Sequence, residues 1–257
     1  MRSTGHEGLF FFHNPKAGGT AVDLLLRAMF APQTCCPLIE NSQRDHEQRA
    51  GAYEAFRGYG YYGGHYGYDI FNAVADGHNA VTNFRTPDRR LLSLYNYYRL
   101  DVTLPEDPAG LDALYPVAFA KDVDFHSFIA SDDPRIEIYT RNFHVRQLTN
   151  SPWQVGTDGD LAHAIQLVDR MPWFYLCEQP ELSDRWGRMV FRNPLFSTEL
   201  KNVTSVARNE LVAVATIEPA TRRLLMAKNE ADYALYTHAR GRLDRIFWLA
   251  RPAARGD

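Results

Sequence analysis

Cysteine is scarce in this chain, with three residues among 257. Cys35 and Cys36 are adjacent, and Cys177 stands alone in an apolar run. Such a set cannot build the paired framework of a disulfide-stabilised secreted domain. We therefore expect a reducing compartment and a cytoplasmic location. The spacing of cysteine and histidine also matches no zinc pattern, so we expect no metal.

Long apolar runs and an excess of positive charge are also lacking. No uninterrupted stretch approaches the ~20 apolar residues that cross a bilayer, and residues 1–7 do not resemble a signal peptide. We expect no membrane span. The formal net charge is −3, from 28 Lys and Arg against 31 Asp and Glu. This balance argues against a general partner such as nucleic acid or an anionic membrane, so any anion site is expected to be local.

The amino-acid composition is that of a globular protein. Hydrophobic residues make up 45% and charged residues 23%, enough to bury a substantial core. The length suits one α/β domain of ordinary size. We predict a single domain over residues 1–257.

Apolar runs alternate with helical patterns along the chain. Expected strands lie at Gly8–Phe12, Ala80–Phe84 and Trp173–Cys177, and the expected helices that follow them lie at Thr20–Phe30, from Pro87 to about Arg99, and at Pro180–Phe191. Asp101–Asp133 suggests a loop with small helices, and Thr216–Leu249 a long helix. Strands that alternate with helices predict an α/β, P-loop-like three-layer fold, in which helices flank a mostly parallel central sheet.

The most informative stretch is Phe10–Val22, where an apolar run breaks into a lysine and glycine turn before a helix. Backbone N–H groups in such a turn can converge on an anion, and the positive end of the helix adds to their field. Lys16 supplies a charge and Thr20 a hydroxyl donor. Lys16 precedes the two glycines, unlike the lysine of the nucleoside triphosphatase loop, so ATP is not the expected ligand. A plain connecting turn explains this segment equally well when it is taken alone.

A second constellation follows the strand at Ala80–Phe84. Arg85 lies at the carboxyl end of this strand, where open α/β sheets bind ligands, and Ser93 lies two helical turns further on. The pair could bind a second phosphate. Alternatively, Arg85 and Arg89 are solvated or form ion pairs with Asp88 and Asp101, and Ser93 is an ordinary helix residue.

The third constellation is a glycine- and tyrosine-rich segment, Tyr61–Asp69, which we expect to form a turn around His65. An imidazole with an unperturbed pKa of ~6.5 can take a proton from an attacking hydroxyl. A loop histidine is more often a surface residue, and the tyrosines could either stack on a sugar or fill the space beneath the loop.

Two further clusters, Asn142–Thr149 and Glu199–Thr204, place a cation beside amide or hydroxyl groups. Either cluster could bind an anion, and either could be the capped start of a helix.

In this order the motifs resemble those of the carbohydrate sulfotransferases that use 3′-phosphoadenosine 5′-phosphosulfate, which include the heparan sulfate 2-O- and 6-O-sulfotransferases. The family's phosphosulfate loop reads H-x-P-K-x-G-G-T-S, and His13–Ala21 differs from it mainly at Ala21, where serine is common. Phe84–Tyr95 is similar in kind to the family's 3′-phosphate element. Gly64–Tyr66 matches its G-H-aromatic turn, although Gly67 stands where some members carry a second histidine.

The resemblance implies a role for each matching residue. The phosphosulfate of the donor would bind Lys16, Ala17, Gly18, Gly19, Thr20 and Ala21; the 3′-phosphate would bind Arg85 and Ser93; Lys201 and Thr204 would complete the donor site. Lys16 would also neutralise the leaving phosphate, and His65 would be the general base. Tyr66, Asn142 and Arg146 are candidate contacts for a carbohydrate or glycoconjugate acceptor.

Two other functions stay open. One is a kinase-like P-loop phosphotransferase, which the lysine-first order and the lack of an obvious Walker B strand disfavour. The other is a non-catalytic nucleotide-binding protein. Should His65 not be the base, Glu178 is the next candidate.

Overall fold

The computed structural model describes residues 8–39, 52–75, 77–154, 156–198, 212–213 and 216–249. Within these ranges four strands form one sheet in the order β2-β1-β3-β4, with all neighbouring strands parallel. The strands are β1 (Leu9–Phe12), β2 (Tyr61–Gly64), β3 (Asn79–Phe84) and β4 (Phe174–Leu176). The predicted α/β architecture with a parallel sheet is confirmed.

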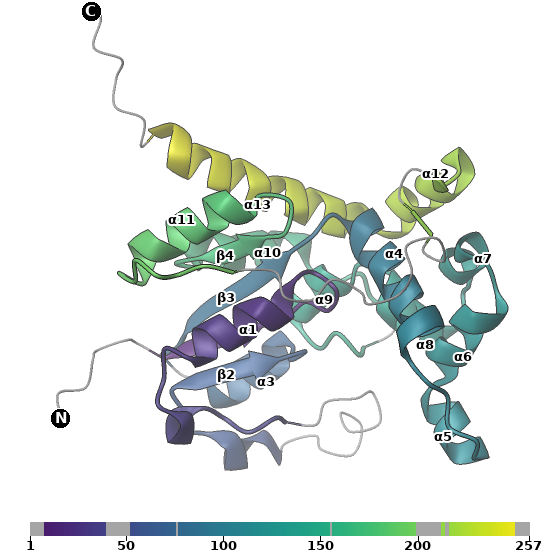
Figure 1. Ribbon diagram of the computed structural model, residues 1–257, viewed down its shortest axis with the longest axis horizontal. Coiled ribbons are helices and arrows are strands. Elements are labelled where there is room, and N and C mark those ends of the chain that lie inside the picture. The colour runs from purple at the N-terminus through teal and green to yellow at the C-terminus, as the bar shows by residue number, and fades with distance from the viewer. Residues whose placement is uncertain are drawn as a thin grey trace, which may run out of the picture.

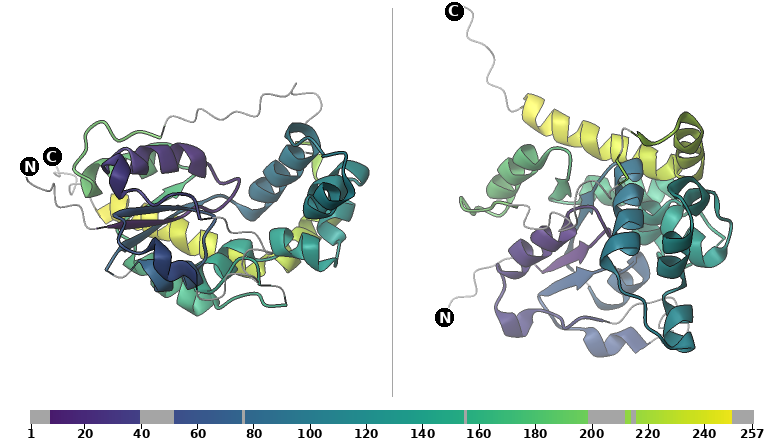
Figure 2. Two further views of the ribbon diagram at one scale, coloured as in Figure 1. Left: turned by 90° about the horizontal axis from the view of Figure 1, so that it is seen from below. Right: turned by 45° about the vertical axis from the view of Figure 1, so that its right-hand side comes forward.

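Helices cover both faces of this sheet. In Figure 2 (left), α1 (Gly19–Arg27, purple) lies on one face and α3 (Tyr68–Val74, blue) on the other. All four residues of β1 are buried, which explains its uninterrupted apolar sequence: a strand in a covered parallel sheet has no solvent side. The remaining helices next to the sheet are α9 (Phe143–Thr149), α10 (Leu161–Arg170), α11 (Pro180–Val190) and α13 (Glu230–Leu249).

A second group of helices forms its own hydrophobic core beside the sheet, on the right of Figure 1. It comprises α4 (Pro87–Asn96), α5 (Pro108–Ala113), α6 (Tyr115–Asp122), α7 (Phe125–Ala130), α8 (Pro134–Thr140) and α12 (Pro219–Lys228). Tyr95, Phe128, Ile136 and Leu225 lie at its centre. A π-helical turn, η3 (Tyr97–Asp101), continues α4, and short 3₁₀ turns lie at η1 (Pro32–Thr34) and η2 (Ala52–Phe56). We refer to this group as the helical lobe.

The turn predicted over Tyr61–Asp69 is confined to residues 65–67, because strand β2 occupies Tyr61–Gly64 and helix α3 begins at Tyr68. The glycines suggested a turn, but their role is close packing: a Cβ on Gly63 would collide with Asp23, and one on Gly64 with the ring of Tyr66. Tyr61, Tyr62 and Tyr66 are buried with bonded hydroxyls, and that of Tyr61 donates to Asp23 over 2.7 Å. His65 is therefore the first residue after strand β2.

The single helix predicted over Thr216–Leu249 is also wrong, because the chain breaks at Asn229 between α12 and α13. The Asn229 side chain is buried and accepts a hydrogen bond from the Asn142 backbone while it donates to the Thr140 carbonyl. These tertiary bonds hold its backbone in a non-helical conformation, which no apolar periodicity can signal.

The other predicted elements are confirmed, with boundaries shifted by a few residues. Thr86 stands at the N-cap position of α4 with Pro87 after it, but its hydroxyl donates to Glu178 instead of capping the helix. No helix in the described ranges is long and apolar enough to cross a membrane.

Candidate active site at the carboxyl edge of the sheet

The carboxyl ends of the parallel strands bring the predicted motifs to one edge of the sheet. Residues 13–18, which we call the Lys16 loop, follow β1; His65 follows β2; Arg85 follows β3; Glu178 follows β4 shortly after. From the central β1 the chain moves to β2 on one side and then to β3 on the other. This reversal creates a crevice at the ends of β1 and β3, the usual ligand position in open α/β sheets.

A buried asparagine that the sequence analysis missed fixes the Lys16 loop. The side chain of Asn83 in β3 accepts from the backbone N–H of Asn14 over 2.8 Å. Its amide donates to the carbonyls of Asn14 and Ala17 over 3.0 and 2.9 Å. A polar residue inside an otherwise apolar strand was the available signal. Because Asn83 is fully buried, these bonds fix the loop with little competition from water.

The loop holds two residues in left-handed conformations, Lys16 with φ 63° and Gly18 with φ 76°. Glycine adopts this conformation freely, whereas for lysine it costs roughly 1–2 kcal/mol. Such strain concentrates at functional sites. Gly19 is required for a different reason, since a Cβ there would collide with the ring of His13. Both glycines therefore have structural roles as well as a predicted ligand role.

Helix α1 begins at this loop without a side-chain cap. Thr20 is exposed in its first turn, Ala21 is half-buried, and Ala17 within the loop is buried. A helix N-terminus without a capping side chain keeps its positive field available to an anion.

The Lys16 ammonium lies over the ring of Tyr97, 3.8 Å from its centroid. Burial lowers the pKa of Lys16, Asp101 raises it and Arg85 lowers it. Tyr97 is exposed and belongs to η3 at the end of α4, so this contact joins the helical lobe to the Lys16 loop. Ser93 lies one helical turn before Tyr97 and therefore shares its face of the helix.

Arg85 contacts the same loop from β3. One of its terminal nitrogens donates to the Lys16 carbonyl over 3.0 Å, and its Nε is buried without a hydrogen-bond partner among the described residues. It forms no ion pair within those residues, so pairing with Asp88 or Asp101 is not found there. A half-buried guanidinium with unused donor capacity suits an anionic ligand.

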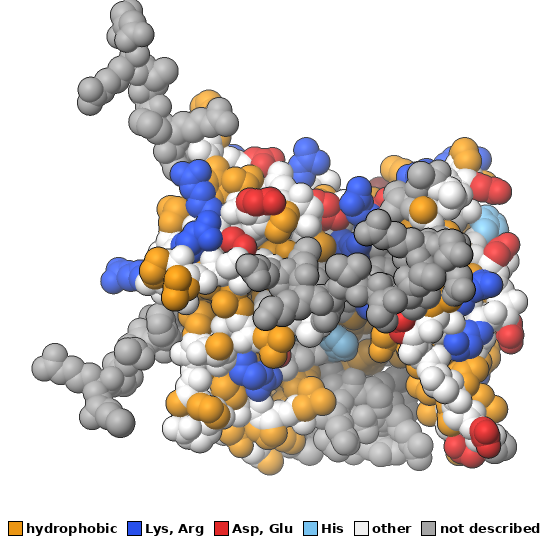
Figure 3. All heavy atoms as spheres, in the orientation of Figure 1, with side chains coloured by type: hydrophobic (Ala, Val, Ile, Leu, Met, Phe, Trp, Pro, Cys, Tyr) orange, Lys and Arg blue, Asp and Glu red, His pale blue; other side chains and the backbone are white. Residues whose placement is uncertain are grey.

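His65 exposes its ring to solvent but has protein around it. Its ring meets that of His13 edge-on, with centroids 4.7 Å apart. The pKa of His65 is lowered to about 4, mainly because surrounding protein replaces water; Asp23 raises it and Lys16 lowers it. At neutral pH the imidazole is uncharged and able to accept a proton. Figure 3 shows histidine surface near the middle of this face, between the sheet and the helical lobe.

Glu178, the alternative base, is committed elsewhere. One carboxylate oxygen accepts from the N–H and hydroxyl of Thr86, and the other accepts from the hydroxyl of Tyr236. Since β4 lies three strands from β2, with strands spaced ~4.8 Å apart, Glu178 is about 14 Å from the His65 end of the sheet. The geometry favours His65.

The three candidate acceptor contacts instead have structural roles. Tyr66 is buried, its hydroxyl accepts from the Ile39 N–H, and burial raises its pKa to about 12. The ring fills the space beneath Gly64, the second of the two alternatives for the tyrosines. The prediction of Tyr66 as an acceptor contact is corrected accordingly.

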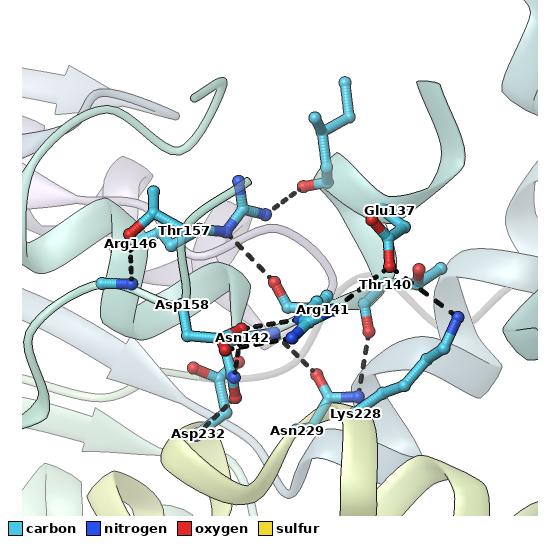
Figure 4. Close-up of polar contacts among 12 residues, drawn as sticks. Glu137, Thr140, Arg141, Asn142, Arg146, Thr157, Asp158, Lys228, Asn229 and Asp232 are labelled. Carbon is cyan, nitrogen blue, oxygen red and sulfur yellow. Dashed lines mark hydrogen bonds and ion pairs between the residues drawn. The ribbon is translucent and has the colours of Figure 1, made fainter. Parts of the chain in front are cut away.

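Asn142 and Arg146 lie in the group of polar residues drawn in Figure 4, which we call the polar cluster. Arg146 is buried and donates to four backbone carbonyls, those of Arg141, Pro152, Gln154 and Ile138. Asn142 donates to Asp158 and accepts from the Asp232 N–H. Neither side chain is directed at the carboxyl edge. Here the alternative of a capped helix start holds, because Asp232 accepts from the N–H groups of His144 and Val145 in the first turn of α9.

Two predicted donor residues, Lys201 and Thr204, lie outside the described residues. Four residues that contact the candidate site were given no role from the sequence: Asn83, His13, Tyr97 and Asp23. Each acts through a contact across elements, which a linear motif does not reveal. Comparison with protein-family models and with curated proteins finds no match for this chain.

Proposed function

We propose that this protein is a sulfotransferase that moves a sulfuryl group from 3′-phosphoadenosine 5′-phosphosulfate to an acceptor hydroxyl on a carbohydrate or glycoconjugate. One observation carries the proposal: the Lys16 loop contacts both of the other motifs. Arg85 donates to its Lys16 carbonyl over 3.0 Å, and the ring of His13 in the loop lies 4.7 Å from that of His65. Three motifs that are separate in sequence thus occupy one site.

The donor carries anions at two positions, and the site offers cationic groups at two. The uncapped start of α1 and Lys16 suit the 5′-phosphosulfate. Arg85, across the crevice on β3, suits the 3′-phosphate, with Ser93 on the adjoining helix as a hydroxyl donor. ATP has no 3′-phosphate and would leave Arg85 without that partner.

The reaction needs positioning and charge stabilisation more than covalent participation by the protein. A bond forms between the acceptor oxygen and sulfur while the bond from sulfur to the 5′-phosphate oxygen breaks, and its electron pair stays on that phosphate. His65 takes the acceptor proton, because its lowered pKa keeps it neutral at pH 7. Lys16 neutralises the departing phosphate after its ammonium leaves the Tyr97 ring.

The proposal places the enzyme in the cytoplasm. Cys35, Cys36 and Cys177 are all free thiols, as a reducing compartment favours.

Thermal unfolding in the presence of nucleotides tests the donor. 3′-Phosphoadenosine 5′-phosphate should raise the melting temperature, since a ligand that binds only the folded state stabilises it. ATP with magnesium should do so much less. A larger rise in melting temperature with ATP and magnesium would favour a phosphotransferase over a sulfotransferase. Radiolabelled donor with a panel of sugars, glycolipids and polysaccharides would then identify the acceptor class.

A further inference from the structure

His13, the first residue after β1, is packed against three parts of the site. Its ring stacks on Phe11, with centroids 5.4 Å apart and planes at 15°. The ring also meets His65 edge-on at 68° and fills the space that a Cβ on Gly19 would need. Its position next to the Lys16 loop is therefore set from below by β1 and from above by α1.

The backbone of His13 is fixed as well. Its N–H donates to the Gly64 carbonyl over 2.9 Å, and its carbonyl accepts from the Gln147 side chain over 3.2 Å. The residue before His65 is thus tied to His13 through the backbone, and His65 itself is tied to it through the ring. A displacement of the Lys16 loop would consequently displace the base.

His13 has a suitable charge state for this position. Burial lowers its pKa well below the ordinary value, and the neighbouring His65 lowers it further. A neutral neighbour exerts no charge repulsion when His65 takes up a proton, whereas a cation 4.7 Å away would oppose that step.

We propose that His13 is a positioning residue that holds the His65 ring in its working orientation and couples it to the occupancy of the Lys16 loop. The inference rests on the proposed function for its catalytic meaning. It adds to the site a second histidine, which follows β1 and contacts the ring of His65.

The groups that face His65 and can change its titration are Lys16 from the loop, Asp23 from α1 and His13 from the end of β1. A test must leave Lys16 and Asp23 in place. His13→Ala removes the ring, and His13→Phe restores an aromatic ring without a titratable group.

The experiment measures three quantities in each variant: affinity for 3′-phosphoadenosine 5′-phosphate, turnover with radiolabelled donor, and the pKa of His65 by NMR of labelled histidine. His13→Ala should lose roughly 10–100-fold in turnover through misplacement of the base. Its His65 pKa should rise toward the ordinary ~6.5, because water enters the space left by the ring. Nucleotide affinity should change by less than turnover, and His13→Phe should recover most of the turnover.

His78→Ala is the matched control. His78 packs on a tyrosine, Tyr62, and against a glycine, Gly8, in the same manner, but at the opposite edge of the sheet. It should leave both turnover and the His65 pKa unchanged. Normal turnover and an unchanged His65 pKa in His13→Ala would overturn the inference. Failure of the unaltered protein to bind the nucleotide would instead overturn the proposed function, while the NMR measurement would still decide whether the two rings are coupled.

Discussion

The carboxyl edge of the sheet and the polar cluster contain the same kinds of side chains, yet they differ in what those side chains bind. In the polar cluster, Arg146 donates to four carbonyls, and Asn229 and Asp232 bond to the backbone around α9. At the carboxyl edge, Lys16 rests on an aromatic ring and Arg85 keeps a buried nitrogen without a partner among the described residues. Each guanidinium nitrogen of Arg146 donates within the protein, whereas Arg85 keeps a donor that a ligand could use.

This difference teaches how to separate a structural polar group from a binding one. Buried donors and acceptors are costly when unpaired, so an unpaired donor beside a loop suited to an anion is a candidate for a ligand contact. Residue type and motif alone placed Asn142 and Arg146 with the site. Their hydrogen bonds place them in the scaffold.

Among changes at the carboxyl edge and in the polar cluster, substitution of His65 should have the largest effect, which is on turnover. His65→Asn should lower turnover by ~10²–10⁴-fold, because the general base is gone, with nucleotide affinity and melting temperature nearly unchanged. Initial rates with radiolabelled donor measure this. His126→Asn, an exposed histidine on α7, is the control. Equal rates in the two variants would remove His65 from catalysis.

Arg146→Met should show the opposite pattern, a loss of stability. The methionine keeps an apolar stem, but four backbone carbonyls lose their donor, at about 1–3 kcal/mol for each one left unsatisfied. We expect the free energy of unfolding in urea to fall by roughly 3 kcal/mol or more. Arg141→Met, which removes exposed ion pairs with Glu137 and Asp158, should cost under about 1 kcal/mol. Similar losses in both variants would show that Arg146 is not a structural centre.

Arg85→Met should weaken the binding of 3′-phosphoadenosine 5′-phosphate by roughly 10–100-fold, the range of a charged hydrogen bond. Affinity for adenosine 5′-phosphate, which lacks the 3′-phosphate, should hardly change. Calorimetric titration of both nucleotides measures the contrast, with Arg135→Met in the helical lobe as the control. An equal loss for the two nucleotides would contradict a 3′-phosphate contact.

A smaller effect is expected from Tyr97→Leu, which removes the ring beneath the Lys16 ammonium. A cation–π contact at an exposed site contributes about 0.5–1 kcal/mol, so nucleotide affinity should increase by about 2–5-fold once Lys16 no longer has to leave that ring. Tyr115→Leu, which removes a similar contact with Arg135, should leave nucleotide affinity unchanged. Weaker binding in Tyr97→Leu would mean that the ring helps to hold the nucleotide.

The smallest effect is the response of turnover to mild acid. The pKa of His65 is lowered to about 4, so the base stays neutral and the rate should hardly change between pH 8 and pH 6. An imidazole with the ordinary pKa of ~6.5 would be about three quarters protonated at pH 6. A rate that falls with a midpoint near 6.5 would contradict the lowered pKa.

Sequence reasoning was most successful where local pattern and global position agree. Hydrophobic patterns predicted the apolar strand β1 and the start of α4 at Pro87. The rule that parallel sheets bind ligands at their carboxyl ends predicted the placement of Lys16 and Arg85 after strands. It failed at Tyr61–Gly64, where glycines serve close packing inside a strand.

What could not be predicted depends on contacts between distant segments. Three examples are the hydrogen bond from Asn142 to Asn229 at the helix break, the bonds from Asn83 to the Lys16 loop, and the contact of His13 with His65. In each case the two partners are far apart in sequence. A polar residue in a motif looks the same in the sequence whether its donors are bonded within the protein or available to a ligand. Only the fold distinguishes the two cases.

Calorimetric titration of the unaltered protein with 3′-phosphoadenosine 5′-phosphate and with adenosine 5′-phosphate tests the central claim most directly. If the carboxyl edge is a donor site with Arg85 at the 3′-phosphate, the bisphosphate should bind at least about tenfold more tightly. Equal affinity for the two nucleotides, or tighter binding of ATP with magnesium than of the bisphosphate, would contradict it.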